Sequence, residues 1–326
     1  MRIAVTGSVA TDHLMTFGGR FADSLVADKL EALSVSFLVD DLEVRRGGVG
    51  ANITFGLGCL GLRPTLIASV GEDFDDYRSW LNRHGVNTDA VHVSTARHTA
   101  RFVCTTDQEQ NQIASFYAGA MTEARDIELG PAMDGAGGID FVIVGADDPV
   151  AMVNYTRECR ERQVDFAADP SQQLSSLDAE QITELVDGAS VLFNNEYEAA
   201  LIERRTGWST EQILQRVKTR VTTLGAQGAR VERADVPAVT VAVPKEEQVV
   251  DPTGVGDAFR AGYLAGMAWL LDVERSAQLG CLLATYVVET VGTQEYGFSR
   301  SEFVQRFADT YGAEAATEID RALGAA

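Results

Sequence analysis

The stretch DPTGVGDAFRAGYLAGMAWLL (residues 251–271) places a glycine-rich turn directly before an aspartate and a long apolar run with helical spacing. Gly254 and Gly256 remove side chains from the turn, so several backbone N–H groups can converge on an anion at the start of the helix. Asp257 would then stand beside that anion. Asp is also a favoured residue at helix N-termini, and for this stretch alone a capping role explains Asp257 equally well.

Apolar runs that read as buried strands alternate with amphipathic helical patterns along most of the chain. The helical patterns include PVAMVNYTRECRER (149–162), and the expected strands are 3–7, 65–71, 141–146, 164–170, 190–196 and 220–225. This order predicts an α/β fold with a predominantly parallel sheet flanked by helices on both faces. Ligands of such folds bind at the carboxyl ends of the strands.

Two segments interrupt this alternation and read as antiparallel strands: SVSFLVDDLEVRRGG (34–48) and TARFVCTTDQEQNQIASFYAGA (99–120), the second a hairpin turning at residues 107–111. We expect them to form a small antiparallel lid over the carboxyl edge of the main sheet. The alternative is a pair of surface insertions without a role. The predicted lid spans residues 13–47 and 99–120, and the main domain spans residues 1–12, 48–98 and 121–326.

The composition narrows the range of partners. The chain has 326 residues and a formal net charge of −21, so it would repel nucleic acid. Its four cysteines are widely spaced, which argues against a disulfide framework or a zinc site. No apolar run approaches the roughly 20 residues that cross a bilayer. We therefore expect a cytoplasmic protein with no membrane partner. The alternating strand around residues 34–44 leaves an apolar face and an edge to cover, which predicts a homodimer through the lid.

Familiar catalytic motifs give no support to other enzyme classes. GLGCLG (56–61) matches a dinucleotide fingerprint in spacing, but it lies inside or at the end of a helix rather than after a strand, so its glycines read as packing positions and a helix stop. The sequence contains no GxxxxGK[ST] and no GxSxG. Its four histidines form no pair at helical spacing that could bind a metal.

Several short motifs at predicted strand ends pair small residues with polar ones: GSVATD (7–12), GGVGAN (47–52), NNEYE (194–198) and TLGAQGA (223–229). In GSVATD, Asp12 could accept two hydrogen bonds from vicinal sugar hydroxyls, or it could form an Asx-turn. In GGVGAN, Asn52 could bind hydroxyls or begin a helix. In NNEYE, Glu198 lies three residues after Asn195, on the same side of a helix.

Taken in order, these motifs, VGEDFDD and DPTGVGDAF resemble the PfkB/ribokinase family of small-molecule kinases over nearly the whole chain. Within the family, GSVATDHL, TARFVCTTD, QIASFY, DPSQQL and DPTGVGDAFRAGYLAG look similar to the adenosine kinases of actinobacteria. The resemblance implies a ribokinase-like fold and a purine-salvage reaction, in which the γ-phosphoryl group of ATP passes to the 5′-hydroxyl of adenosine. ATP and Mg²⁺ are the implied cosubstrate and metal, and K⁺ is an implied activator.

The resemblance also implies roles for individual residues. Asp257 matches the family's catalytic base, and its anion hole corresponds to Gly254, Val255 and Gly256. The nucleoside site would comprise Ser8, Asp12, Gly48, Asn52, Phe102, Phe116, Gln172 and Gln173, with the two phenylalanines closing over the purine. The ATP site would comprise Asn195, Thr223, Gly225 and Gly228. Glu198 would organise Mg²⁺ through water, and Asp251 would contribute to a monovalent-cation site.

Three departures from the family pattern limit the comparison. DPSQQL replaces the Asn and Arg that sugar kinases of the family carry after the aspartate, which favours a nucleoside acceptor. Pro252 replaces a more usual Thr and removes one backbone donor, and Val255 replaces a common Ala. The alternatives to an adenosine kinase are a sugar kinase of the same fold, acting on ribose or fructose, and a nucleoside-binding protein without catalysis.

Overall fold

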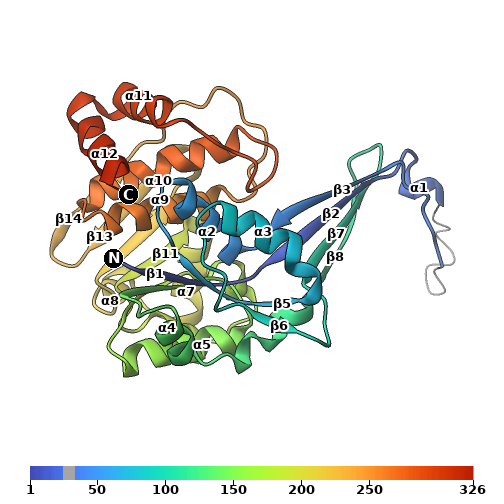
Figure 1. Ribbon diagram of the computed structural model, residues 1–326, viewed down its shortest axis with the longest axis horizontal. Helices are drawn as coiled ribbons and strands as arrows, with labels where there is room; N and C mark the ends of the chain where they lie inside the picture. The colour runs from blue at the N-terminus through green and yellow to red at the C-terminus, as the bar shows by residue number, and fades with distance from the viewer. Residues whose placement is uncertain (25–33, 326) are drawn as a thin grey trace.

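The computed structural model describes residues 1–24 and 34–325. An eight-stranded sheet forms its centre, in the order β14-β13-β12-β11-β10-β9-β1-β4 (Figure 1). Strands β12 to β4 run parallel, and β13 and β14 add an antiparallel edge. The strands are β1 (Ile3–Thr6), β4 (Thr65–Ile67), β9 (Phe141–Val144), β10 (Asp165–Ala168), β11 (Val191–Asn195), β12 (Thr219–Thr223), β13 (Ala229–Arg233) and β14 (Val236–Val241).

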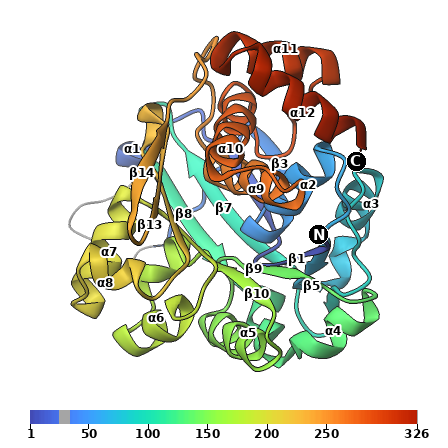
Figure 2. The ribbon, with the colours of Figure 1, turned by 90° about the vertical axis from the view of Figure 1, so that its left-hand side faces the viewer.

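Helices cover both faces of this sheet, so its strands alternate side chains between two cores (Figure 2). On β9, for example, Ile143 belongs to one core and Val142 to the other. One face carries α2 (Val49–Cys59), α3 (Asp75–Arg83), α9 (Val255–Ala268), α10 (Val273–Val288), α11 (Arg300–Tyr311) and α12 (Ala313–Ala325). The other carries α4 (Leu129–Gly135), α5 (Pro149–Glu161), α6 (Ala179–Val186), α7 (Glu196–Thr206) and α8 (Thr210–Leu214).

A second sheet projects from one side of this body, in the order β3-β2-β7-β8 (Figure 1). Its strands are β2 (Ala10–Thr16), β3 (Asp41–Gly47), β7 (Ala100–Thr106) and β8 (Gln112–Tyr117). Two antiparallel pairs, β2–β3 and β7–β8, are joined by a parallel pairing of β2 with β7. The predicted fold class, a ribokinase-like α/β body with a small second sheet, is confirmed. We call the second sheet the lid.

Short elements connect these parts. They are the helix α1 (Phe21–Ser24), the strands β5 (Ser69–Gly71) and β6 (His92–Ser94), and the 3₁₀ turns η2 (Glu72–Phe74), η3 (Gly119–Asp126), η4 (Ser171–Ser175) and η5 (Gly225–Gln227). In the described parts of the chain, no helix combines the length and the apolar character needed to cross a bilayer.

Three details differ from the sequence-based expectations. The run 65–71 is not one strand, because the chain breaks at Ala68 and its two halves pair in different sheets, β4 with β1 and β5 with β6. Residues 34–39 are not strand, and β3 begins only at Asp41. The lid sheet starts earlier, at Ala10, because β2 is a lid strand that the pattern analysis did not identify. Residues 25–33 of the predicted lid range lie outside the described residues.

The packing interpretation of GLGCLG is confirmed. A β-carbon at Gly56 would lie 2.7 Å from the β-carbon of Ala261, so the glycine lets α2 approach α9 closely. A β-carbon at Gly58 would lie 1.9 Å from the carbonyl oxygen of His84. Helix α2 ends one residue later, at Cys59. The close contact of α2 with α9 is what brings Asn52 and Asp257 together.

Candidate active site

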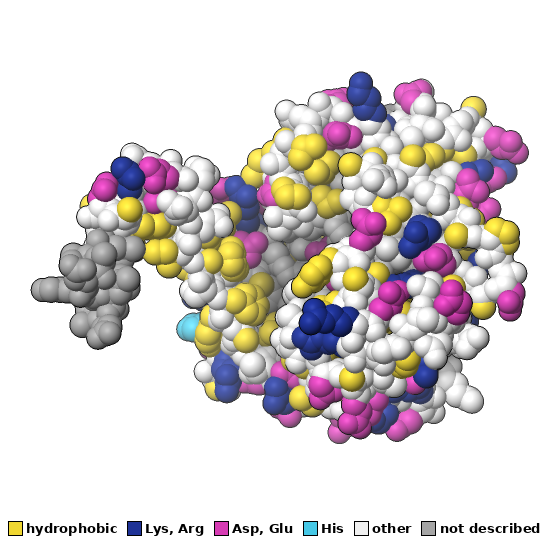
Figure 3. All heavy atoms as spheres, turned by 180° about the vertical axis from the view of Figure 1, so that it is seen from behind, with side chains coloured by type: hydrophobic (Ala, Val, Ile, Leu, Met, Phe, Trp, Pro, Cys, Tyr) yellow, Lys and Arg dark blue, Asp and Glu magenta, His cyan; other side chains and the backbone are white. Residues whose placement is uncertain are grey.

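The carboxyl ends of the central strands and the lid enclose a cavity of about 730 Å³. Figure 3 shows the hollow between lid and body from behind. Its walls come from both sheets and from the start of α9, and they include these residues singled out in the sequence: Ser8, Asp12, Gly48, Asn52, Phe102, Phe116, Gln172, Gln173, Asp251, Gly254 and Asp257. The cavity therefore brings together most of the predicted nucleoside and phosphoryl-transfer residues.

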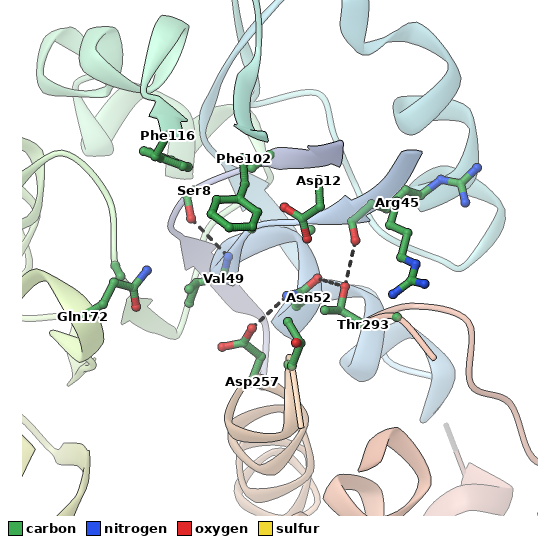
Figure 4. Close-up of a pocket in the computed structure, with 18 of the residues that line it drawn as sticks. Ser8, Asp12, Arg45, Val49, Asn52, Phe102, Phe116, Gln172, Asp257 and Thr293 are labelled. Carbon is green, nitrogen blue, oxygen red and sulfur yellow. Dashed lines mark hydrogen bonds between the residues drawn. The ribbon is translucent and has the colours of Figure 1, made fainter. Parts of the chain in front are cut away.

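Asp257 lies in the first turn of α9 with its carboxylate directed at α2 (Figure 4). Asn52 Nδ2 donates a hydrogen bond of 2.8 Å to Asp257 Oδ2. Burial raises the pKa of Asp257, while Arg260 and the Asn52 hydrogen bond oppose that shift and Glu198 adds to it. The N-cap of α9 is Gly254, and no side chain caps the helix, so the alternative in which Asp257 is the helix cap is wrong. Its carboxylate is tied to Asn52 instead.

The amide of Asn52 is held in one orientation by its neighbours. Thr293 Oγ1 and Gln294 Nε2 both donate to Asn52 Oδ1, each at 2.9 Å, which leaves Nδ2 to face Asp257. Gln294 Nε2 also lies 2.5 Å from the hydroxyl of Tyr77, which donates to the carbonyl of Gly47. The sequence reasoning missed Thr293, Gln294 and Tyr77, because GTQEYG (292–297) matches no pattern that it considered.

The turn before Asp257 offers free backbone donors. The amide groups of Gly256 and Asp257 have no hydrogen-bond acceptor among the described residues, whereas Ala258 already bonds to Gly254. Gly254 has φ of 77°, a conformation that favours glycine, and a β-carbon there would lie 2.9 Å from Thr293. Gly254 lines the cavity, and Val255 and Gly256 follow it in the same turn without lining it. Free amides at a helix N-terminus suit an anion.

The wall nearest to β1 and β2 holds the residues expected to bind ribose. Ser8 Oγ accepts a hydrogen bond of 3.1 Å from the amide of Val49, which fixes the start of α2 against β1 (Figure 4). A β-carbon at Gly48 would lie 2.5 Å from the carbonyl oxygen of Ser8, so only glycine permits this approach. Asp12 lies on β2, where burial raises its pKa to about 6, with Arg45 lowering and Asp251 raising it.

The lid contributes two aromatic rings to the cavity. Phe102 on β7 and Phe116 on β8 are directly opposed in the strand register, and Asp12 on β2 is directly opposed to Phe102. Phe116 is 54% exposed. Gln172 and Gln173 lie across the cavity in η4, with Gln172 facing the two rings (Figure 4). A flat apolar group between these walls would find aromatic faces on one side and amides on the other.

The residues expected to bind ATP lie at the adjoining strand ends, outside the lining of this cavity. Asn195 ends β11 and pairs in register with Thr223, the last residue of β12. Gly225 and Gly228 follow in the turn around η5, with φ of 57° and 97°. These four positions share one edge of the sheet with Asp257 but form a separate group.

Glu198 and Asp251, the two expected cation ligands, already have local partners. Asn195 and Glu198 form a reciprocal capping box at the start of α7, in which Glu198 Oε2 accepts from the Asn195 amide at 2.8 Å. Asp251 accepts from the amides of Thr253 and Gly292 and lies 3.6 Å from Arg45. Within the described ranges, no three His, Cys, Asp or Glu side chains group as a metal site would require. The second carboxylate oxygen of Glu198 could still hold a metal through a water molecule, so the predicted role of Glu198 fits this geometry.

Two cavity cations were not identified from the sequence. Arg45 and Arg46, neighbours on β3, both line the cavity. Arg45 pairs with Glu43 and Asp251, and Arg46 pairs with Glu295 and lies 4.3 Å above the ring of Trp80. Arginines on a lid strand carry no motif of their own, so only the folded arrangement reveals their position.

Comparison with known proteins shows the family of this chain and several similar kinases. The sequence model of the pfkB family carbohydrate kinases matches residues 10–298. The chain is 28% identical to a nucleoside kinase of Methanothermobacter thermautotrophicus over 290 residues, which are 88% of this chain and 92% of that protein. It is 25% identical to the nucleoside kinase of Methanocaldococcus jannaschii over 295 residues, covering 90% of this chain and 92% of that one.

Solved structures give a similar result. The Burkholderia thailandensis nucleoside kinase in complex with inosine is 32% identical, with a TM-score of 0.83, over 95% of this chain and 99% of that chain. The ligand-free form of the same kinase gives a TM-score of 0.86 at 33% identity, over 94% of this chain and 99% of that chain. The similarity thus extends over nearly the whole of both chains.

Proposed function

Because the chain belongs to the pfkB family of carbohydrate kinases, we propose that it transfers the γ-phosphoryl group of ATP to the 5′-hydroxyl of adenosine, giving AMP and ADP. Its class, an ATP-dependent nucleoside or carbohydrate kinase, follows from the family and from its similarity to nucleoside kinases. Those relatives do not single out the actinobacterial adenosine kinases, so that narrower identity stays a prediction.

One observation supports the proposal above the others. Asp257 is held by Asn52 at the start of α9, in the same cavity as the two lid phenylalanines. An acceptor with a hydroxyl at one end and a flat base at the other matches these two ends. A bare sugar would leave the aromatic end unfilled.

In the proposed reaction, Asp257 accepts the proton of the 5′-hydroxyl as the oxygen attacks the γ-phosphorus. A bond forms between the 5′-oxygen and phosphorus, and the bond between phosphorus and the β,γ-bridging oxygen breaks to release ADP. The free amides of Gly256 and Asp257 would stabilise the charge on the transferring group, and fixed amides need little reorganisation as that charge develops. Bound Mg²⁺, organised through water by Glu198, would neutralise phosphate charge.

The remaining residues have supporting roles in the proposal. Ser8, Asp12 and Gly48 would hold the ribose, with Asn52 positioning Asp257, and Gln172 and Gln173 would bind the base edge. Asn195, Thr223, Gly225 and Gly228 would bind ATP. Asp251 would contribute to a monovalent-cation site for K⁺ beside the anion hole. That role needs a rearrangement, since its carboxylate now binds two amides.

A second acceptor, inosine, is favoured by a specific observation. The similar Burkholderia enzyme binds inosine. Adenine and hypoxanthine differ in their donors and acceptors at one edge, and a glutamine amide can present either its NH₂ or its oxygen to that edge. The two glutamines are therefore compatible with either purine.

The test is to incubate the protein with ATP, Mg²⁺ and one acceptor at a time: adenosine, inosine, guanosine, ribose or fructose. ADP release and product identity are measured together. AMP formed preferentially from adenosine supports the proposal, and preference for inosine or guanosine would move the acceptor within the purine nucleosides. Preference for ribose or fructose would overturn the nucleoside assignment. Binding of adenosine without ADP release would leave only a binding protein.

The proposal includes a homodimer through the lid. The face of the lid turned away from the cavity carries four half-exposed apolar side chains, Leu42, Val44, Ile113 and Tyr117, which are 46–55% exposed. The strand register places Leu42 opposite Met15 and Ile113 opposite Thr105, on the side that Asp12, Phe102 and Phe116 do not occupy. A second copy meeting this face would cover it.

A further inference from the structure

An ion pair lies buried beneath the anion-hole turn. Arg260, one helical turn after Asp257, places Nε 2.5 Å from Asp169 Oδ2. Arg260 is 5% exposed and Asp169 is fully buried. Asp169 directly follows β10 and precedes the segment that carries Gln172 and Gln173. The pair thus joins the helix that bears Asp257 to the strand end that forms the opposite wall.

Folding alone gives no reason to keep such a pair. Moving two charges out of water carries a large desolvation cost, and well-packed apolar residues in their place are often equally or more stabilising. The surroundings of Arg260 would accept apolar groups, because its guanidinium lies 5.7 Å from the ring centroid of Phe193 in the core. Since stability does not require this buried pair, we look for its role in the electrostatics of the active site.

The guanidinium also lies against the turn itself. A β-carbon at Gly256 would be 2.8 Å from Arg260 Nη1. The absence of a side chain at position 256 therefore lets the guanidinium lie against the turn that contains the free amides of Gly256 and Asp257. A cation at this distance strengthens the positive potential of the helix N-terminus.

Asp257 needs this cation because its other charged neighbours are negative. Glu198 from α7 and Asp169, which follows β10, both lie near enough to disfavour a second negative charge in this group, and Asn52 from α2 is neutral. The hydroxyls of Tyr77 and Tyr296 are also near enough to interact electrostatically with Asp257, and burial raises the pKa of both. Arg260 is the one cation that favours the ionised form of Asp257 among the charged groups resolved around it.

We propose that Arg260 is a positioning residue of the active site, anchored by Asp169, which keeps Asp257 ionised and strengthens the positive potential of the anion-hole turn. This inference rests on the proposed function, because it assumes that Asp257 accepts the proton. It assigns to Asp169 the role of fixing the guanidinium while partly cancelling its charge. Removal of Arg260 should therefore raise the pKa of Asp257, and removal of Asp169 should lower it.

The experiment measures kcat at saturating nucleoside and ATP against pH in the wild type and in Arg260→Met, Asp169→Asn and the double variant. Saturation removes the effect of Asp12 on nucleoside binding, so the acid limb of this kcat profile reports the pKa of the base in the enzyme–substrate complex. Arg260→Met should move the limb upward by about one pH unit. Asp169→Asn should move it downward, because the guanidinium is then uncompensated. Arg260→Lys, which keeps a cation, should restore a limb near that of the wild type.

Several controls keep the test decisive. Arg300→Met removes an exposed arginine paired with Asp320 at 2.7 Å, and it should leave the limb unchanged. If Arg260→Met unfolds because Asp169 is left unpaired, the double variant removes both charges and still reports the loss of the cation. An unchanged limb in Arg260→Met and the double variant, with lower activity only, would overturn the inference. Movement of all variants in one direction would also overturn it.

A separate variant distinguishes failure of this inference from failure of the proposed function. Asp257→Asn should remove most of the turnover, because it removes the proton acceptor. If Asp257→Asn turns over normally, the proposed function fails. If Asp257→Asn is inactive while the limb ignores Arg260 and Asp169, only the role of Arg260 fails.

Discussion

At the scale of single residues, the site depends on how a buried carboxylate is held. Among the residues that the structure describes, Asn52 Nδ2 is the one donor to the Asp257 carboxylate, and that donor is oriented by Thr293 and Gln294. The arrangement keeps one carboxylate oxygen bound and leaves the other for a substrate hydroxyl. A carboxylate is a weak base, but it is adequate for phosphoryl transfer because the hydroxyl proton moves late in the reaction.

We expect Asp257→Asn to lower turnover by at least about a hundredfold, in line with the loss of a general base. The substitution keeps the size of the side chain, so the circular dichroism spectrum and the melting temperature should change little. Turnover is measured as AMP formed per enzyme at saturating ATP and adenosine. Near-normal turnover would contradict the assignment of Asp257 as the base.

Asp12 gives a prediction about pH. Its pKa is raised to about 6, so nucleoside binding through an ionised Asp12 should weaken as the pH falls through that value. The effect of pH on folding stability has the opposite sign to its effect on binding. In the free protein, the contribution of Asp12 to stability is greatest below the unfolded pKa of about 4 and is lost as the pH rises through the folded pKa.

Calorimetric titration with adenosine between pH 5 and pH 8 measures this effect. The dissociation constant should rise toward the acid end in the wild type, whereas Asp12→Asn should bind weakly with little dependence on pH. A wild-type dissociation constant that is flat over this range would show that Asp12 does not bind the ligand in its ionised form.

At the scale of elements, the lid hairpin makes a specific prediction about the acceptor. Phe102→Ala or Phe116→Ala should weaken binding of a purine nucleoside by about fivefold or more, since an aromatic stack contributes roughly 1 kcal/mol or more per ring. Ribose has no base to stack, so its binding should change less. Phe102→Tyr and Phe116→Tyr keep the ring and should bind the nucleoside almost as the wild type does. An equal loss for adenosine and ribose would argue against stacking.

The elements also show what the sequence could and could not predict. Hydrophobic runs and helix patterns were sufficient for the parallel strands and most helices, because burial on both faces leaves a continuous apolar signal. The break at Ala68 was not visible, since both halves of that run are buried and look alike in hydrophobicity. The edge hairpin β13–β14 was missed because its strands are partly exposed and lack that continuous signal.

The residues of the candidate site also fall into those that the sequence predicts and those that it does not. Residues in short glycine-rich motifs, such as Asn52 and Gly254, were identified before the fold was known, and the structure places them in one cavity with Asp257. Arg45, Thr293 and Arg260 were not identified. Each depends on a contact between segments far apart in the chain, and spacing within one segment carries no record of such contacts.

At the scale of the whole molecule, the apolar outer face of the lid predicts the oligomeric state. Light scattering at micromolar concentration should give twice the chain mass. Leu42→Asp with Val44→Asp places charges on this face and should give the monomer mass. Leu38→Asp is a useful control, because Leu38 is 88% exposed and precedes β3. A wild-type monomer at that concentration would contradict the dimer.

The path of the chain from β1 to β2 has a consequence for engineering. Only three residues separate the end of β1 at Thr6 from the start of β2 at Ala10, so the central strand of the body continues almost directly into the lid. Asp12 and Phe102 are lid residues, whereas Asp257 and Gly254 belong to the body. With the residue roles that we propose, a chimera of this chain carrying the lid of a relative would take that relative's acceptor preference, while the phosphate-binding turn would still be that of this chain.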